Sequence, residues 1–420
     1  MNTDESEQLM KLLNTYFDKL SLTETPIKQK QLNNLLKILY NDIKLADNWA
    51  SAEDIVNKVR AYLKKSSKFE DVVPQWILQE TKYIPECVRT YIKEHFQGYL
   101  IYKCEIGSRK IEIIFGLLQD HDNESMAQFD EYVKKMITWL KIAFLYAPEQ
   151  CSKTLKIYGF LTPFRKELPD NQFSVLSPNN CNSAVTTSCQ TDGEIIIYRK
   201  EEFIKVFIHE TFHSLGLDFS AMSLGGFNKK VQQQFPLDSD FNLFEAYTEF
   251  WAGTMNGLIT AYGALDDKDD VEAFLLYSDF FLKSEQIFSL FQMIKTLDFM
   301  GLKYNNLYDN DGISTDARRH LFKENTNVFA YYIIKNLLFY NNADFIMWCR
   351  DNNANILEFK KTTLNLESFL KFIISNHNNN DLLNDVEKMD VFLQKMKRRA
   401  LNSGNNKLYK TMRMSMCDAF

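Results

Sequence analysis

The feature that most constrains the fold is the stretch at residues 194–216, EIIIYRKEEFIKVFIHETFHSLG. Its first part is a run of β-branched residues, which predicts a buried strand. The apolar segment directly after it has helical spacing and predicts a helix that stops at Gly216, because glycine readily adopts the left-handed conformation that ends helices. A strand that leads directly into a helix predicts an α+β fold.

The chain before this stretch alternates between helical and strand-like patterns. Apolar residues recur at helical spacing within residues 8–95, which predicts an N-terminal helical region over residues 1–97. Strands are then predicted at 99–106, 110–118 and 154–163, with a helix at 125–146. The polar run NSAVTTSC at 182–189 is typical of an exposed edge strand. Residues 98–220 are therefore predicted to form a sheet-and-helix unit.

The second half of the chain has mostly helical patterns. Residues 221–395 are predicted to form a helical lobe, with breaks at YGALDDKDD and GLKYNNLYDNDG. Residues 396–420 are predicted to form a basic C-terminal tail that begins within the stretch KMKRR (395–399), and a solvated tail is favoured over a binding arm.

Composition excludes some classes of protein. With a net charge of -6 and 45% hydrophobic residues, the chain is predicted to be a folded protein that does not bind nucleic acid. The first residues lack the basic start and apolar core of a secretion signal, and no apolar run reaches the roughly 20 residues that span a membrane. The seven cysteines form no CxxC pair and predict reduced thiols. A cytoplasmic protein without membrane contact is expected.

The predicted helix contains the motif HExxH, formed by His209, Glu210 and His213. Residues four apart lie on the same helix face, so the two imidazoles can bind one zinc ion, Zn2+, per chain. Zinc lowers the pKa of water, and the glutamate can take the proton. The alternative is a helical structural protein in which the motif arose by chance and its histidines are satisfied by other partners.

The order of strands and helices around this motif resembles the upper lobe of the zincin metallopeptidases, over roughly residues 99–220. The resemblance implies a mixed sheet plus the HExxH helix, with an N-terminal helical extension and a mainly helical lower lobe. It also implies that the edge strand binds an extended peptide by adding it to the sheet.

The third zinc ligand decides which zincin branch the chain resembles. HETFHSLGLDFS is similar to the metzincin motif, but Phe219 stands where a third histidine is required. Asp218 is an oxygen donor one residue out of register, and it stays an alternative. DSDFNLFEAYTEFWAG is similar to the second helix of the gluzincins, which implies that Glu245 is the ligand and that Glu249 supports a zinc histidine from outside the ligand set.

The lower lobe of such enzymes often supplies a donor to the oxyanion that develops during hydrolysis. The segment ARRHLFKENTNVFAYYIIKNLL at 317–338 is the richest source, and Tyr332 is favoured over Tyr331. For each tyrosine, the alternative is a packing role with a satisfied hydroxyl.

These features together predict a zinc-dependent peptidase that acts on a peptide or protein substrate, with Glu210 as general base. An inactive zincin-fold binding module is the alternative. The combined motifs are similar to uncharacterised zincin-like proteins of large DNA viruses, which would place the protein in host cytoplasm or in a virion. The sequence leaves the oligomeric state open.

Overall fold

A computed structural model describes residues 3–16, 19–53, 55, 59, 61–65, 68, 70, 72–79, 82–118, 123–403 and 407–418. The strands are β1 (Ala61–Lys65), β2 (Gly98–Ile106), β3 (Arg109–Leu117), β4 (Thr154–Thr162), β5 (Ala184–Thr186) and β6 (Asp192–Arg199). The helices of the first half are α1 (Asp4–Leu13), η1 (Asn14–Tyr16), α2 (Pro26–Ala50), α4 (Gln75–Gln79), α5 (Glu86–His95), α6 (Asn123–Tyr146), α7 (Pro178–Cys181) and α8 (Phe203–Ser214). Those of the second half are α9 (Gly225–Gln234), α10 (Leu243–Gly263), α11 (Val271–Phe299), η3 (Tyr304–Leu307), α12 (Gly312–Leu321), η4 (Phe329–Ile334), α13 (Lys335–Tyr340), α14 (Asn342–Asn352), α15 (Thr363–Asn376), α16 (Asn380–Ser403) and α17 (Lys407–Lys410).

The strands form one mixed sheet in the order β1-β2-β3-β4-β6-β5. β2 and β3, both predicted as strands, form a hairpin whose turn requires the left-handed conformation of Gly107 (φ 60°). β3, β4 and β6 are parallel, and β5 pairs antiparallel with β6 at the outer edge. The predicted edge strand is therefore confirmed in its place, although its paired part is only three residues long.

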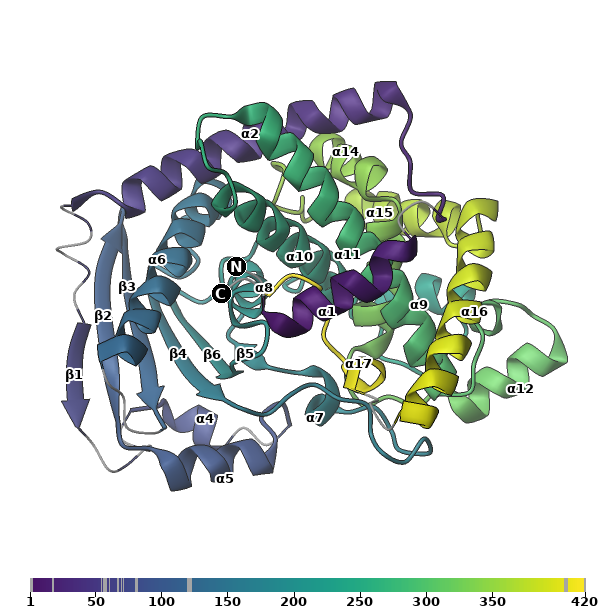
Figure 1. The fold of residues 1–420 in the computed structure, drawn as a ribbon, viewed down its shortest axis with the longest axis horizontal. Coiled ribbons are helices and arrows are strands. Elements are labelled where there is room, and N and C mark those ends of the chain that lie inside the picture. Colours follow the sequence, from purple (N-terminus) through teal and green to yellow (C-terminus); the bar gives the residue numbers. More distant parts are fainter. Residues whose placement is uncertain are drawn as a thin grey trace.

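Helices cover both faces of the sheet (Figure 1). Alternate strand residues point to opposite faces, so Ile195 and Ile197 pack with α6 and α8, whereas Ile196 packs with α5. The helical lobe is built around α10 and α11, which pack on each other, and α10 also packs on α8. The fold is thus mixed, with the HExxH helix enclosed between the sheet and the helical lobe.

The predicted N-terminal helical region also contains a strand. β1 pairs antiparallel with β2 and extends the sheet at the edge opposite β5. Its short, Lys-rich sequence AYLKK lacks a long β-branched run, which is the signal that identifies a strand in a sequence.

The prediction of a solvated C-terminal tail is wrong for residues 411–418. These residues run through the interior, and Met412, Met416 and Cys417 are completely buried. Side chains of surrounding helices bind the backbone of the tail, as when Asn256 of α10 donates to the carbonyl of Cys417 at 3.0 Å. Methionines alternate with polar residues in TMRMSMC. The free energy gained by burying these apolar side chains outweighs the tendency of the basic residues before them to stay in solvent. In Figure 1 the marks for the two chain ends lie next to each other near the middle of the view.

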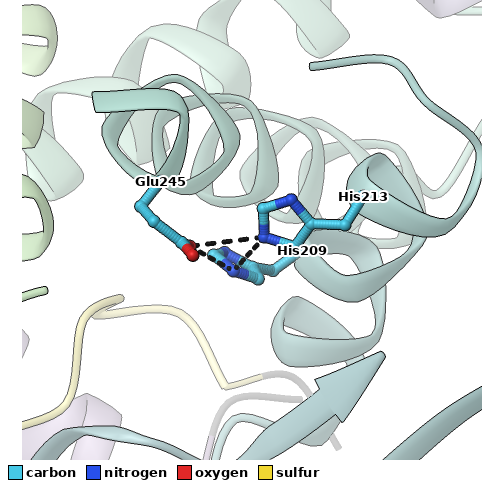
Figure 2. A group of neighbouring side chains, drawn as sticks. All are labelled: His209, His213 and Glu245. Carbon is cyan, nitrogen blue, oxygen red and sulfur yellow. Dashed lines mark hydrogen bonds and ion pairs between the residues drawn. The ribbon is translucent and has the colours of Figure 1, made fainter. Parts of the chain in front are cut away.

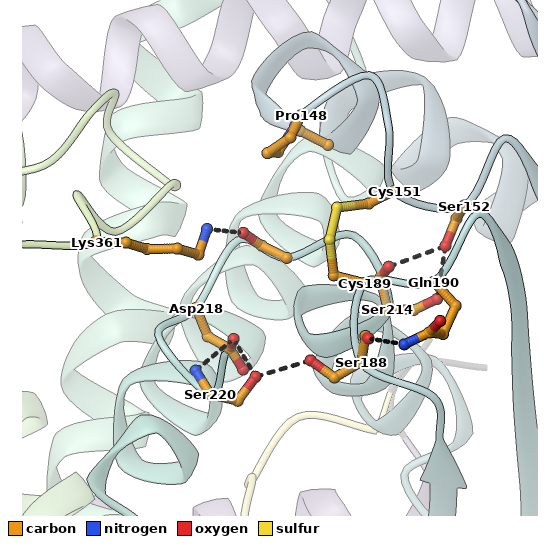
Figure 3. The surroundings of a disulfide bond; sticks show 12 residues. Pro148, Cys151, Ser152, Ser188, Cys189, Gln190, Ser214, Asp218, Ser220 and Lys361 are labelled. Carbon is orange, nitrogen blue, oxygen red and sulfur yellow. Dashed lines mark hydrogen bonds between the residues drawn. A yellow bond between two sulfur atoms is a disulfide. The ribbon is translucent and has the colours of Figure 1, made fainter. Parts of the chain in front are cut away.

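The prediction that all cysteines are reduced is also wrong, because Cys151 and Cys189 form a disulfide (Figure 3). Cys151 precedes β4 and Cys189 precedes β6, and these strands are neighbours in the sheet. The disulfide joins residues that are 38 apart in sequence. The spacing of the cysteines did not indicate that these two would pair. Within the part of the chain that the structure describes, no helix combines the length and apolar character needed to cross a membrane.

Candidate metal centre

Helix α8 holds the two histidines of the motif inside the protein. Every residue of α8 is buried, including His209 and His213. The helix follows β6 closely and ends at Ser214, two residues before Gly216, which adopts the left-handed conformation (φ 64°) that was predicted to stop it. The two imidazoles lie one above the other on one face of the helix (Figure 2).

Helix α10 brings Glu245 to the two histidines. The carboxylate Oε2 of Glu245 lies 3.2 Å from Nε2 of His209 and 3.3 Å from Nε2 of His213. The two Nε2 atoms are 3.1 Å apart. These three side chains are the group of possible metal ligands that the described residues contain. The structure therefore brings together the three residues that the sequence suggested as zinc ligands.

The opposite nitrogen of each imidazole contacts a carboxylate. Nδ1 of His209 lies 2.8 Å from Oε1 of Glu249, and Nδ1 of His213 contacts Oδ2 of Asp218. Carboxylates accept protons, so each Nδ1 carries the hydrogen and each Nε2 presents its lone pair to the centre of the group. Asp218 is thus placed as a support for His213 and away from the ligand positions.

The donor set fits a zinc ion. Two imidazole nitrogens and one carboxylate are a known zinc ligand set, and at bond lengths of about 2.0–2.1 Å neighbouring tetrahedral ligands lie about 3.3–3.4 Å apart. The three separations of 3.1, 3.2 and 3.3 Å are close to this edge length. Without a cation, two lone pairs and a carboxylate would face one another in a buried place, which is unfavourable.

The charges around the group favour a cation there. Burial alone lowers the pKa of His213, but Glu245 and Asp218 outweigh it and hold this pKa well above its usual value. Burial alone raises the pKa of Glu245, but the histidines lower it to about 2. The carboxylates therefore attract positive charge to the imidazole pair.

Glu249 is part of a buried ion pair as well as a partner of His209. Its carboxylate contacts Lys205, which lies one turn before His209 on α8. Burial alone raises the pKa of Glu249, but Lys205 and His209 lower it well below its usual value. Lys205 was missed in the sequence, although a lysine on an otherwise apolar helix signals a buried partner.

Glu210 is an acidic side chain of this site that does not fix the position of either imidazole. It is buried to 8% exposure and lines a cleft of about 250 Å³ in front of the imidazoles. Burial raises the pKa of its carboxyl, although the neighbouring histidines act in the opposite direction. The cleft is bordered by α8, α10, η4 and the edge strand, through Ala184, Thr186, Phe244, Asn327 and Tyr331 among others.

On the open side of the edge strand, backbone groups beside the cleft have no hydrogen-bond partner among the described residues. Tyr198 N donates to Ser183 O at 2.9 Å, and Thr187 N donates to Glu194 O at 3.2 Å. Hydrogen-bonded and non-hydrogen-bonded residues alternate along an antiparallel pair. The peptide groups of Ala184 and Thr186 therefore point away from β6, along the open edge.

The structure separates the two candidate tyrosines. Tyr331 lines the cleft, with its ring centroid 6.2 Å from that of His209. Tyr332 points the other way, and its hydroxyl donates to the carbonyl of Met412 at 2.7 Å. Of the two, Tyr331 lines the cleft, and Tyr332, which the sequence favoured, does not.

Other residues considered in the sequence lie away from the metal group. Arg318 is buried and donates to the carbonyls of Asn306 and Asp309, while Arg319 and His320 are exposed on α12. Phe219, at the metzincin ligand position, packs in the core with its ring centroid 4.4 Å from that of Phe359.

The loop that carries the disulfide is connected to the metal group (Figure 3). Cys189 N donates to the carbonyl of His213 at 3.1 Å. The hydroxyls of Ser188 and Ser220 are 2.9 Å apart, and Ser220 Oγ donates to Asp218 Oδ1 at 2.7 Å. The loop thus supports the carboxylate that orients His213.

No protein family, curated protein or solved structure matches the chain in comparisons with known proteins.

Proposed function

We propose that this protein is a zinc-dependent peptidase, with an upper lobe of the zincin type and a gluzincin-like ligand set of His209, His213 and Glu245. The observation that carries the proposal is the convergence of both Nε2 atoms and the Glu245 carboxylate, while carboxylates hold both Nδ1 atoms. A chance HExxH on a solvated helix would not need this arrangement.

The zinc ion would act as a Lewis acid that polarises the substrate carbonyl and lowers the pKa of water. Glu210 would take a proton from the attacking water on a carboxylate oxygen, helped by the raised pKa of its buried carboxyl. The water oxygen joins the carbonyl carbon, the C–N bond breaks, and Glu210 passes the proton to the leaving amine.

Two further elements would position the substrate. The free peptide groups of Ala184 and Thr186 would pair with an extended peptide along the sheet edge. Tyr331 would donate its hydroxyl to the carbonyl oxygen as negative charge develops there. These roles match where the side chains and backbone groups border the cleft.

The test compares wild type with Glu210→Gln on a broad peptide library, with products identified by mass spectrometry and zinc measured in both proteins. Glu210→Gln should keep its zinc and lose hydrolysis by several orders of magnitude, since the amide cannot accept the proton. The control is the His209→Ala, His213→Ala double variant, which should lose both zinc and hydrolysis.

Other outcomes would favour the alternatives. Zinc binding without any cleavage by wild type would indicate an inactive binding module. Equal zinc content in wild type and the double histidine variant would reject the metal site itself.

A further inference from the structure

A small cavity continues the cleft inward, past His209 and Glu210, to the C-terminal segment. The cleft and this cavity share residues of β5, α8 and η4. The cavity adds to its walls the buried charged side chains Lys166, Lys205 and Glu249, and also Cys181, Ser183, Val206 and Met414. Its volume is about 30 Å³. One water-sized sphere takes up about 10–15 Å³ in the same measure, so the cavity has room for only two or three non-hydrogen atoms.

The walls of the cavity are held in place. Met414 N donates to Oε1 of Glu202 at 3.0 Å, and the carbonyl of Met414 accepts from Lys335. On the other side, Val206 belongs to the fully buried helix α8. Closely packed walls of this kind do not adapt easily to an added methylene.

The cavity also contains an unused polar group. Ser183 is only 5% exposed, and its Oγ has no hydrogen-bond partner among the described residues. The backbone of Ser183 is fixed because its carbonyl accepts from Tyr198 N. A buried hydroxyl without a partner is unfavourable, and a hydroxyl on a bound ligand would satisfy it.

We infer that this cavity is a subsite for the side chain of one residue beside the scissile bond, and that it selects glycine, alanine or serine. The inference rests on the peptidase function proposed above. The side chains of alanine and serine fit within this space, and the hydroxyl of serine pairs with Ser183. Leucine carries three more carbons, which would overlap Met414 and Val206. The substrates are therefore peptides or proteins with a small residue beside the cleaved bond.

The experiment uses peptides that differ only at the residues on either side of the cleaved bond. For wild type, kcat/KM should be at least tenfold higher with glycine, alanine or serine than with leucine at one of the two positions, because one methylene alone changes this ratio by about 10–200-fold. Met414→Ala should reduce that preference at least tenfold, since it enlarges the cavity.

Met416→Ala is the matched control. It removes an equally buried methionine from the same segment, but this residue does not line the cavity. The preference should stay within threefold of wild type. Val206→Ala enlarges the cavity from α8 and should also admit leucine, which tests the inference even if Met414→Ala does not fold. Ser183→Ala should lower kcat/KM for the serine peptide relative to the alanine peptide by about fivefold, the effect of one hydrogen bond.

Two results would overturn the subsite while leaving the peptidase proposal intact. One is cleavage by wild type that is indifferent to side-chain size at both positions. The other is a preference for small residues over leucine that Met414→Ala and Val206→Ala leave at the level of Met416→Ala. If zinc-loaded wild type cleaves no peptide, both the peptidase proposal and this inference fail.

Discussion

Replacing Asp218 by asparagine should weaken zinc binding without changing the ligand set. One carboxylate oxygen of Asp218 contacts Nδ1 of His213, and the other accepts from the backbone and side chain of Ser220 at 3.0 and 2.7 Å. In Asp218→Asn one of these oxygens becomes an NH2 group, which cannot accept from Nδ1–H or from Ser220. If the NH2 group faces His213, the ring would shift its proton toward Nε2 and lose the lone pair that binds the metal. If it faces Ser220, two donors would meet at the backbone N–H of that residue and displace the side chain that supports His213.

The expected size of the effect follows from the place of Asp218. Losses of such supporting groups typically reduce metal affinity by 10–100-fold, or about 1.4–2.8 kcal/mol. Asp218 is completely buried, so water cannot replace the lost acceptor. Glu249→Gln is a less selective test, because it would also leave the buried Lys205 without its partner.

The assay is a zinc titration in competition with a chelating dye, with circular dichroism to check the fold. Ser220→Ala is the control, since it removes one donor to Asp218 but keeps the contact with His213, and its zinc affinity should stay within threefold of wild type. If Asp218→Asn binds zinc as tightly as Ser220→Ala, the carboxylate does not set the proton position on His213.

Three further predictions concern stability. Tyr332→Phe should lower the free energy of unfolding in urea by about 1–2 kcal/mol, because it leaves the buried carbonyl of Met412 unpaired. Its zinc affinity should not change. An unchanged free energy of unfolding would contradict the hydrogen bond. Burial raises the pKa of Glu324 from 4.5 to about 8, so between these pH values the unfolded chain releases a proton that the folded protein keeps, and stability falls as pH rises. The free energy of unfolding of Glu324→Gln, relative to that of wild type, should therefore rise between pH 5 and pH 8.5. A difference between the two proteins that does not change with pH would refute the raised pKa. The Cys151→Ser, Cys189→Ser double variant should lose about 2–4 kcal/mol for a closed loop of this length, and a reductant should destabilise wild type but not the variant.

The parts of the site that the sequence predicted depend on local geometry. His209 and His213 share a face because they are four residues apart in one helix, and this holds wherever the helix packs. Glu245 and Glu249 are likewise four apart on α10, and the structure places both carboxylates at the imidazoles. The edge strand was also predictable, because its alternating polar pattern reflects its own exposure.

The parts that the sequence did not predict depend on contacts between distant segments or on irregular backbone. Tyr331 and Tyr332 lie in η4, which is a π-helix, and the wider turn changes which residue faces inward. Helical periodicity therefore could not choose between them. The burial of the C-terminal segment depends on acceptors such as Glu202 and Glu285, which are 212 and 132 residues away from Met414 and Cys417.

These distant contacts fix both ends of the helix that carries the histidines. At its start, Glu202 adopts a left-handed conformation (φ 56°), which costs a non-glycine residue about 1–3 kcal/mol. Its carboxylate accepts the amides of Met414 and Ser415 at 3.0 and 2.5 Å, and these bonds hold it there. At the other end, the amide of Cys189 in the disulfide loop binds the carbonyl of His213.

A helix anchored in this way has little freedom to shift along its axis or to rotate. The Nε2 atoms are therefore held close to one another before any cation arrives, and such preorganisation of ligands is what a tight metal site requires. Loosening either anchor should then weaken zinc binding, although neither anchor touches the ligand atoms. The C-terminal segment and the disulfide loop thus belong to the proposed metal centre as much as the motif does.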